Sequence, residues 1–397
     1  MSKSVVSVNL KEAQLKRKLR EHLHSLGFTK SENGVLLAPG NSKEVIRSLH
    51  QAQRKERLEA SISFICNKHK KLLEYFASGT DIVPTRISPV LELVDSRTWS
   101  GELFRLASLT WSVPVSNGFG RRLRYLVWDE SNGKLMGLIA IGDPVFNLAV
   151  RDNYIGWNAR DRSDRLVNVM DAYVLGAIPP YNSLLCGKLI ASLLRTQELY
   201  DDFAIKYGSA TGLISKAEKK ACLLAVTTSS SMGRSSVYNR VRLNNTEYLK
   251  SLGYTGGWGH FHIPDWLFKE LREYLREKDH RYADQYSFGQ GPNWRLRATK
   301  AALSTLGFKA DLLKHGIQRE VFISQLAKNS LDILRTGQGV PDISNLKSSR
   351  EVAEASLQRW IIPRAEWDNS YLKWNSSSIV ELLGVKTQQI INKQNIA

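Results

Sequence analysis

Two apolar segments joined by a short turn constrain the fold of this chain more than any other feature. Residues 123–128 and 134–141 are strand-like, and the five residues between them contain Asn132-Gly133. An Asn-Gly pair between two such runs is a strong short-range signal for a β-hairpin. We therefore expect an antiparallel pair of strands here, with the rest of a sheet built beside it.

Strand and helix patterns alternate after this hairpin. Buried strands are predicted at residues 166–178 and 221–226, and an aromatic strand at 257–263, because these runs are apolar and rich in β-branched or aromatic residues. Helices are predicted at residues 184–199 and 235–241. The order hairpin, strand, helix, strand, helix, strand predicts an α/β (α+β) fold with a mixed, mostly antiparallel sheet.

The N-terminal region has a helical pattern. Leu15, Leu19, Leu23 and Leu26 fall on one face at helical spacing, and Gly27 is placed to end the helix. Up to residue 75 the chain has 15 Lys plus Arg against 7 Asp plus Glu. A second stretch with helical spacing runs through Val45, Leu49, Leu58, Ile62 and Ile65. Two basic helices in series are typical of a module that contacts phosphates, and a solvated helical face that flanks the core is the alternative.

Helical spacing returns beyond residue 264. Three stretches show it, 266–276, 296–306 and 319–334, and a polar tail from residue 373 holds one more helix candidate at 379–383. We therefore divide the chain into a basic N-terminal helical region (1–100), an α/β core (101–264) and a C-terminal helical region (265–397).

The charge balance points to a polyanionic partner. The 397 residues include 56 Lys plus Arg and 38 Asp plus Glu, which gives a formal net charge of +18. Such a surface attracts polyanions, of which nucleic acid is the usual one, and DNA is the expected partner. A solvated basic surface without a partner is the alternative.

Cysteine usage and hydropathy indicate a cytoplasmic protein. Cys66, Cys186 and Cys222 lie far apart in apolar surroundings, without metal-ligand spacing or a plausible disulfide framework. No apolar run approaches the ~20 residues that span a bilayer. We expect no membrane partner.

Residues 226–263 gather hydroxyl, guanidinium, phenol, amide and imidazole groups behind a strand end. We interpret this mixture as a polar pocket with Thr228, Tyr238, His260 and His262 as candidate catalytic residues. Tyr238 would need activation as a nucleophile, because the ordinary pKa of tyrosine is about 10. A half-buried aromatic on a helix is the alternative for Tyr238.

The two histidines stand two residues apart on the predicted strand, so His260 and His262 would point to the same face as an acid/base pair. Histidines that form hydrogen bonds at the rim of a sheet are the alternative. Because no third ligand stands at a fixed spacing, we predict no metal site.

Basic and aromatic residues supply the candidate nucleic-acid contacts. Trp294 could stack on a base while Arg295 and Arg297 reach phosphates, the combination used for single strands. The alternative is a Trp buried between helices with its arginines in water. The full set of predicted contacts is Arg151, Arg160, Arg234, Asn239, Arg240, Trp294, Arg295 and Arg297.

Asn182, Ser183, Gly187 and Lys188 form a candidate phosphate loop after the predicted strand. Free amides at a helix N-terminus, together with the lysine, could bind a phosphate oxygen. The alternative is a strand-to-helix turn with Asn182 or Ser183 as the N-cap. The sequence leaves any cofactor unknown.

The order of elements resembles the core of the GCN5-related N-acetyltransferases. In that family a hairpin is followed by a strand, a loop that faces a pyrophosphate at a helix N-terminus, and a second strand and helix. The resemblance implies that residues 180–187 face the pyrophosphate of coenzyme A and that Tyr238 stands on the second helix as a catalytic Tyr.

Longer strings resemble the family of the Druantia anti-phage defence protein A. The matching strings are RDNYIGW (151–157), PPYNSLLCGKLIA (179–191), GRSSVYNRVRL (233–243), LGYTGGWGHFHI (252–263), GPNWRLR (291–297) and HGIQRE (315–320). The resemblance implies a bacterial cytoplasmic protein that works beside a helicase-type partner and other defence-system subunits.

We therefore expect a component of a bacterial anti-phage defence complex that binds DNA or another nucleic acid. Two other classes stay open. One is an enzyme of the same core, either a nuclease that uses His260 and His262 or an acyltransferase that uses Tyr238, and the other is a non-catalytic adaptor subunit. The sequence decides neither the preferred strandedness of the nucleic acid nor whether the chain forms a homo-oligomer.

Overall fold

The computed structural model divides the chain into two compact units. It describes residues 2–32, 36–40, 42–116, 120–211, 218–219, 221–284, 292–308 and 310–384. We call the first the helical unit, made of Met1–Gln53, Ser231–Gly233 and Thr255–Arg319. The second, the sheet unit, is made of Arg54–Ser230, Arg234–Tyr254 and Glu320–Ala397.

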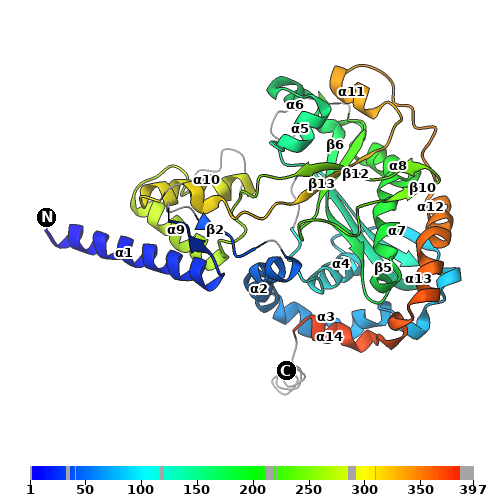
Figure 1. Ribbon diagram of the computed structural model, residues 1–397, viewed down its shortest axis with the longest axis horizontal. Coiled ribbons are helices and arrows are strands. Elements are labelled where there is room, and N and C mark those ends of the chain that lie inside the picture. The colour runs from blue at the N-terminus through cyan, green and yellow to red at the C-terminus, as the bar shows by residue number, and fades with distance from the viewer. Residues whose placement is uncertain are drawn as a thin grey trace. The chain divides into compact units, whose positions relative to one another are not determined.

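A seven-stranded sheet organises the sheet unit (Figure 1). Its strands are β3 (Pro89–Leu93), β4 (Arg122–Asp129), β5 (Lys134–Gly142), β6 (Val169–Ala177), β9 (Ala225–Ser229), β12 (Lys250–Tyr254) and β13 (Glu320–Gln325), in the order β12-β13-β9-β6-β5-β4-β3. Every neighbouring pair is antiparallel except β6 and β9, which are parallel. The predicted mixed, mostly antiparallel sheet is therefore confirmed.

The predicted hairpin is formed by β4 and β5, with Asp129 opposite Lys134. Gly133 has φ +67°, a left-handed conformation that glycine adopts without a steric penalty, and its N–H donates to the Asp129 carbonyl at 2.8 Å. The Asp129 carboxylate accepts a 2.7 Å hydrogen bond from the Ser131 hydroxyl. The turn residues thus set the register of the hairpin.

Helices cover both faces of this sheet, which explains why β5 is apolar and buried after Lys134 and why β4 is buried from Tyr125 to Val127. On one face α7 (Cys186–Ser192), α8 (Gln197–Tyr207) and α12 (Ser349–Ser356) pack through residues such as Leu189, Leu199 and Val352. On the other face α3 (Ile62–Leu72), α4 (Trp99–Leu109) and α14 (Ile379–Leu382) pack through Ile65 and Leu103. The remaining helices are α5 (Ala149–Ile155), α6 (Ala159–Arg165), α11 (Ser330–Thr336) and α13 (Ile362–Trp367).

The helical unit is built on α1 (Ser2–Ser25), α9 (Asp265–Glu277), α10 (Pro292–Thr305) and the part of α2 (Lys43–Ala60) up to Gln53. Leu15, Leu19 and Leu23 are buried in its core, as their spacing predicts. Gly27 ends α1 with φ +82° and donates its N–H to the His24 carbonyl. A two-stranded ladder, β1 (Thr29–Lys30) with β2 (Leu36–Leu37), follows.

Three predicted elements are wrong. Residues 235–241 form turns instead of a helix, since Arg240 has φ +61°, which is outside the helical region. Residues 257–263 form turns with one isolated bridge, Trp258 to Lys314, instead of a strand. Residues 319–334 were predicted as a helix but contain β13, because a strand buried between two neighbours has the continuous apolar run that a buried helix also has.

Other boundaries shift by a few residues. The predicted helix at 184–199 is split into α7 and α8, and the strand predicted at 221–226 is β9, which begins at Ala225. Two short ladders complete the sheet unit, β7 (Ala210–Thr211) with β8 (Glu218–Lys219) and β10 (Arg242–Leu243) with β11 (Thr246–Glu247). The polar tail beyond residue 384 lies outside the described residues.

The division into regions 1–100, 101–264 and 265–397 stays a prediction. Each of the two compact units is made of several segments that are separate in the chain. Within the described residues, the helices are too short or too polar to traverse a bilayer.

Candidate nucleic-acid interface

A buried carboxylate holds the turn at residues 234–240 in place. Glu320, on β13 and only 4% exposed, accepts hydrogen bonds from the Ser235 N–H at 3.0 Å and from the Asn239 side-chain amide at 2.8 Å. It also accepts one from the Ser251 hydroxyl at 3.0 Å. The sequence predicts Asn239 as a nucleic-acid contact, but its side-chain amide is hydrogen-bonded within the turn. It donates to the Ser235 carbonyl as well as to Glu320.

Tyr238 lies on the inner side of the same turn. Its hydroxyl donates to the Leu175 carbonyl of β6 at 2.7 Å, and its ring packs edge-on against Phe322 with centroids 5.6 Å apart. Burial, and to a smaller extent the Asp171 charge, raises the pKa of the Tyr238 phenol. In this geometry the phenol is protonated at neutral pH and engaged with main chain.

We predict that Tyr238→Phe lowers the free energy of unfolding by about 1 kcal/mol, the ordinary contribution of one such hydrogen bond. Denaturant titration at pH 7 measures it. Tyr254→Phe is the control, because Tyr254 is 43% exposed and should change stability little. A Tyr238→Phe protein as stable as wild type would show that the Leu175 carbonyl does not hold the phenol.

Thr228 lies beside the place where the parallel strands β6 and β9 part. Its hydroxyl donates to the Ala172 carbonyl at 2.9 Å, and the neighbouring Thr227 hydroxyl donates to Asp171 at 2.8 Å. Burial raises the pKa of Asp171 to about 6, although Thr227 and Arg151 both oppose this rise. Asp171 is thus a carboxylate whose charge changes close to neutral pH.

Lys188, Arg240 and Arg359 form a group that we call the three-cation cluster. The Lys188 ammonium donates to the carbonyls of Asn239 at 2.8 Å and Val237 at 3.1 Å, and it lies 5.7 Å from the centre of the Trp360 ring. Arg240 directly follows Asn239, Arg359 directly precedes Trp360, and the charges of both act on the lysine. Burial, followed by the charges of Arg240 and Arg359, lowers the pKa of Lys188.

Among the described residues, no carboxylate neutralises this cluster. None of its three cations forms an ion pair with the described part of the chain, and the side chains of Arg240 and Arg359 are exposed. Lys188 and Arg240 were predicted from different motifs and lie together here. Arg359, on the π-helical turn Leu357–Ile361, was missed, because nothing in its local sequence separates it from any other surface arginine.

The rest of the predicted phosphate loop is a tight connection. Tyr181–Leu184 form a short 3-10 turn, Leu185 has φ +61°, and α7 begins at Cys186. A Cβ added at Gly187 would come within 3.1 Å of Val237, so glycine lets the turn at 234–240 pack on α7. Asn182 is exposed, and the Ser183 carbonyl accepts from Arg364 at 3.1 Å.

Arg151, Arg160 and Arg234 differ in exposure. Arg151 is fully buried and donates to Asp152 and to the carbonyls of Val145 and Phe146. The backbone N–H of Arg160 is capped by Asn158 at 2.8 Å while its side chain is exposed. Arg234 is exposed as well. Arg160 and Arg234 therefore present their charges to solvent and Arg151 does not.

Trp294 and Arg295 are engaged within the helical unit. The Trp294 indole N–H donates to the Tyr282 carbonyl at 3.1 Å, and its ring packs edge-on against Phe268. Arg295 is ion-paired with Asp265 and donates to the Ile263 carbonyl at 2.7 Å. Arg297 is exposed.

His260 and His262 lie in turns of the helical unit, whereas Thr228 and Tyr238 belong to the sheet unit. A ring nitrogen of His262 is 2.9 Å from the Leu312 carbonyl, and its ring centre is 5.8 Å from that of His315. Burial, followed by nearby positive charge for His260, lowers the pKa of both histidines to about 4. A single cleft that joins these four residues stays a prediction. The described residues contain no group of three or more His, Cys, Asp or Glu side chains placed to hold a metal ion.

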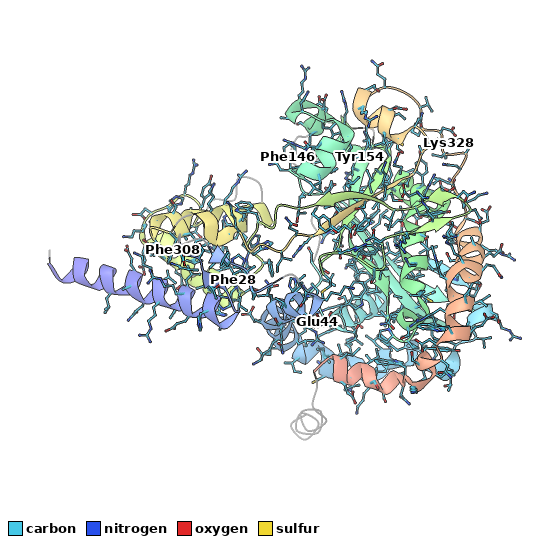
Figure 2. All side chains as sticks on the ribbon, in the orientation of Figure 1. Phe28, Glu44, Phe146, Tyr154, Phe308 and Lys328 are labelled. Atoms are coloured by element: carbon cyan, nitrogen blue, oxygen red, sulfur yellow. The ribbon has the colours of Figure 1, made fainter. Side chains whose placement is uncertain are left out.

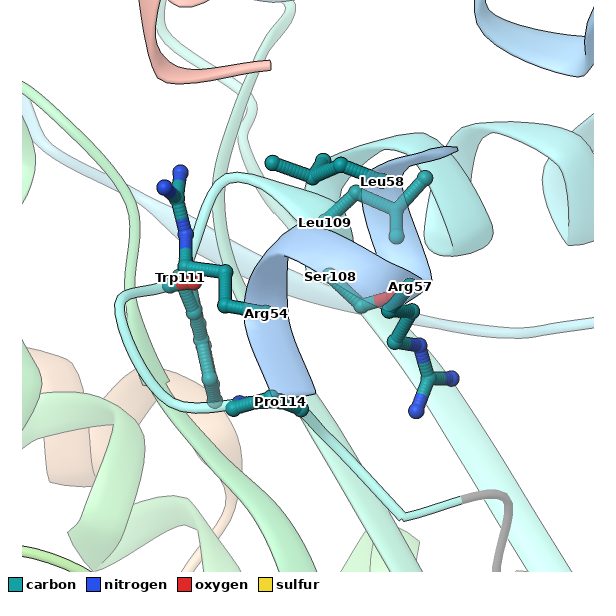
Figure 3. Close-up of a pocket in the computed structure, with 7 residues that line it drawn as sticks. All are labelled: Arg54, Arg57, Leu58, Ser108, Leu109, Trp111 and Pro114. Atoms are coloured by element: carbon teal, nitrogen blue, oxygen red, sulfur yellow. Dashed lines mark hydrogen bonds between the residues drawn. The ribbon is translucent and has the colours of Figure 1, made fainter. Parts of the chain in front are cut away.

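A small hollow in the sheet unit is lined by Arg54, Arg57, Leu58, Ser108, Leu109, Trp111 and Pro114 (Figure 3). Figure 3 shows the guanidinium groups of Arg54 and Arg57 pointing in opposite directions. Arg54 donates to the carbonyls of Trp111 and Leu382, and Arg57 donates to that of Val115. These arginines tie chain segments together and do not converge on a shared ligand position.

The fold and this cluster define a mixed α/β protein with a sheet covered on both faces and a basic group that forms no ion pair with a carboxylate of the described residues. The family model of the Druantia protein DruA matches residues 40–336, and the chain belongs to this family. A Druantia protein DruA from Escherichia coli (strain UMEA 4076-1) is 65% identical over 379 residues, which are 96% of this chain and 94% of that protein. No solved structure matches the chain, and the acetyltransferase-like character of the core is not confirmed.

Proposed function

We propose that this chain is a nucleic-acid-binding component of a Druantia anti-phage defence system, acting in the cytoplasm with other subunits that include a helicase-type partner. Membership of the Druantia protein DruA family supports the defence role. The three-cation cluster is the observation that supports nucleic-acid binding. The net charge of +18 supports the same partner, with DNA as the expected one.

Repulsion between the like charges of the three-cation cluster supports a bound phosphate. Lys188 is held by two carbonyls beside Arg240 and Arg359, and the lowered pKa of its ammonium reflects burial and their charges. A phosphate placed between the arginines would relieve this repulsion and accept charge-assisted hydrogen bonds from guanidinium groups. Backbone contacts of this kind carry affinity without sequence specificity. Arg160 and Arg234 are further proposed contacts because they are exposed.

We predict that Arg240→Glu combined with Arg359→Glu weakens DNA binding at least tenfold and lowers the slope of log affinity against log salt by about 2, one for each lost phosphate contact. Fluorescence anisotropy with labelled DNA from 50 to 300 mM salt, about the range in which such contacts are screened, measures both quantities.

The control for this variant is Arg97→Glu, which makes the same kind of charge change at a site in the sheet unit where Arg97 pairs with Asp95 at 3.1 Å. The control should bind DNA almost as wild type does. An equal loss in both variants would show that bulk charge acts rather than the cluster, and salt-independent binding of the wild type would reject the proposal.

Catalysis at the Tyr238 region is the second candidate, favoured by the raised pKa of Asp171 beside Thr227 and Thr228. Incubation with labelled DNA and divalent metals tests a nuclease, and incubation with acetyl-coenzyme A tests an acyltransferase. Turnover that is lost in Tyr238→Phe would establish an enzyme. Absence of turnover with intact DNA binding would leave a binding role, and co-purification with the partner subunit without DNA binding would indicate an adaptor.

A further inference from the structure

A hollow on the helical unit combines an aromatic ring, an apolar floor and basic side chains. It is lined by Lys300, Leu303, Ser304, Phe308 and Leu313 and has a volume of ≈ 290 Å³, its open mouth included. Leu303 and Leu313 are 1% and 0% exposed and form the floor. Figure 2 labels Phe308 in this unit, at the end of the chain segment that carries α10.

The cations beside this hollow are not neutralised. The Arg20 guanidinium lies 5.6 Å from the centre of the Phe308 ring, and Lys300 and Ser304 are exposed at the mouth. Neither Arg20 nor Lys300 forms an ion pair with a described residue. On the same helix as Arg20, by contrast, Arg17 pairs with Glu21 at 2.7 Å and Lys18 pairs with Glu270 at 2.7 Å.

We propose that this hollow binds one nucleotide of a single-stranded nucleic acid. The base stacks on Phe308, with the planar guanidinium of Arg20 against the same ring, and the adjoining phosphate contacts Lys300. Stacking on an aromatic ring beside cations that follow the backbone is how proteins bind single strands without reading their sequence. The inference rests on the proposed nucleic-acid binding and adds a preference for single strands, because the bases of a duplex are stacked on each other and cannot reach the ring.

The probe is a short oligothymidine with one 2-aminopurine, whose fluorescence reports stacking, compared with a duplex of equal length on the full chain. We expect Phe308→Leu to weaken binding of the single strand about tenfold, as loss of one stacked base does, and to leave duplex binding within twofold. The change in 2-aminopurine emission on binding should disappear. Since leucine carries no charge either, the salt slope should stay the same.

Arg20→Gln and Arg17→Gln are matched variants three residues apart on α1. Arg20→Gln should weaken single-strand binding and Arg17→Gln should not, since Arg17 is already paired. If Phe308→Leu lowers the midpoint of thermal unfolding, the affinities of Arg20→Gln and Lys300→Gln for the single strand test the proposal instead. Both residues are exposed, so these substitutions should leave the stability of the fold unchanged.

The two proposals fail in different ways. Single-strand affinity that stays within twofold in Phe308→Leu and Arg20→Gln, while the double substitution at Arg240 and Arg359 still weakens binding, overturns the inference and leaves the proposed function. A wild-type protein that binds neither probe at low salt overturns both. Equal loss of single-strand and duplex affinity in Phe308→Leu also overturns the stacking role.

Discussion

Replacing Arg151 by methionine is expected to lower the free energy of unfolding by about 3 kcal/mol or more, although the sequence suggests a surface contact for nucleic acid. The Arg151 side chain is fully buried in the sheet unit. It donates to Asp152 at 2.7 and 2.9 Å and to the carbonyls of Val145 and Phe146, both at 2.9 Å. Methionine would leave the buried Asp152 carboxylate without this partner, a change that typically costs about 3–5 kcal/mol, and would remove the hydrogen bonds to the two carbonyls. Arg162 would still pair with Asp152 at 3.0 Å, which places the expected loss near the lower end.

Arg160→Met is the matched control for this prediction. Arg160 lies nine residues further on, its side chain is exposed, and it has no ion pair with a described residue. Denaturant unfolding should give wild-type stability for Arg160→Met and a large loss for Arg151→Met. DNA affinity that falls in Arg151→Met while stability holds would mean that Arg151 is free to contact nucleic acid, contrary to this structure.

Acid is expected to destabilise the helical unit strongly between pH 6.5 and about 4, by at least about 4 kcal/mol in total. Burial, the largest cause for each ring, lowers the pKa of His50, His260 and His262 to about 4 and that of His315 to about 3. In the unfolded chain these histidines take up protons near pH 6.5, and in the folded chain they stay neutral until about pH 4. The unfolded state therefore binds more protons in this window, so stability falls as the pH falls. Each histidine contributes at most about 3 kcal/mol, because this window spans about 2.5 pH units and each unit corresponds to about 1.4 kcal/mol.

The surroundings of these rings favour the neutral form. Arg319 opposes a charge on His50 and His315, and Arg295 opposes one on His260. Nδ1 of His315 accepts the Ile317 N–H at 3.2 Å, which requires that this nitrogen carry no proton. Neither ring nitrogen of His50 makes a hydrogen bond of ordinary geometry with a described residue, although Gln53 slightly favours the charged form.

Hydrogen exchange of the amides in α9 and α10, followed from pH 7.5 to 4.5, measures the stability of this unit separately from the sheet unit. His50→Leu should reduce the loss over this range by up to about 2 kcal/mol and keep most of the stability at pH 7.5. Carboxylates with lowered pKa values, such as Glu12 and Asp284, act at lower pH, and Asp171, with its raised pKa, acts in the opposite direction. Protection in α9 and α10 that does not change between pH 7 and 5 would contradict the prediction.

Local patterns predicted much of the fold because neighbouring residues alone decide those elements. The Asn132-Gly133 turn supplies the left-handed residue that the hairpin needs, and the leucine spacing of α1 needs only one apolar side to be buried. The strand β13 could not be recognised in this way. It is buried between β9 and β12, so its apolar run carries no alternation that would separate it from a helix. The sequence also predicted membership of the Druantia family, because long and unusual sequence strings resemble that family.

The candidate site was harder to predict because its members are distant in sequence. Separate motifs predict Lys188 and Arg240, and no motif predicts Arg359, which lies more than a hundred residues later. Arg151 and Asn239 have the side chains of nucleic-acid contacts, yet hydrogen bonds within the fold occupy both. The type of a residue determines what its side chain can bind. Burial and hydrogen bonds within the fold determine whether that side chain is available to a ligand.

By itself, the sequence determined the basic charge, the hairpin, the terminal helix and the kinship with Druantia protein DruA, since each depends on composition or on residues close in the chain. Only the tertiary structure decided that β13 lies inside the sheet, that Glu320 holds the turn carrying Tyr238, and which arginines keep their charge exposed. The reason is that burial and pairing are properties of contacts between segments far apart in the chain, and a linear pattern does not record those contacts.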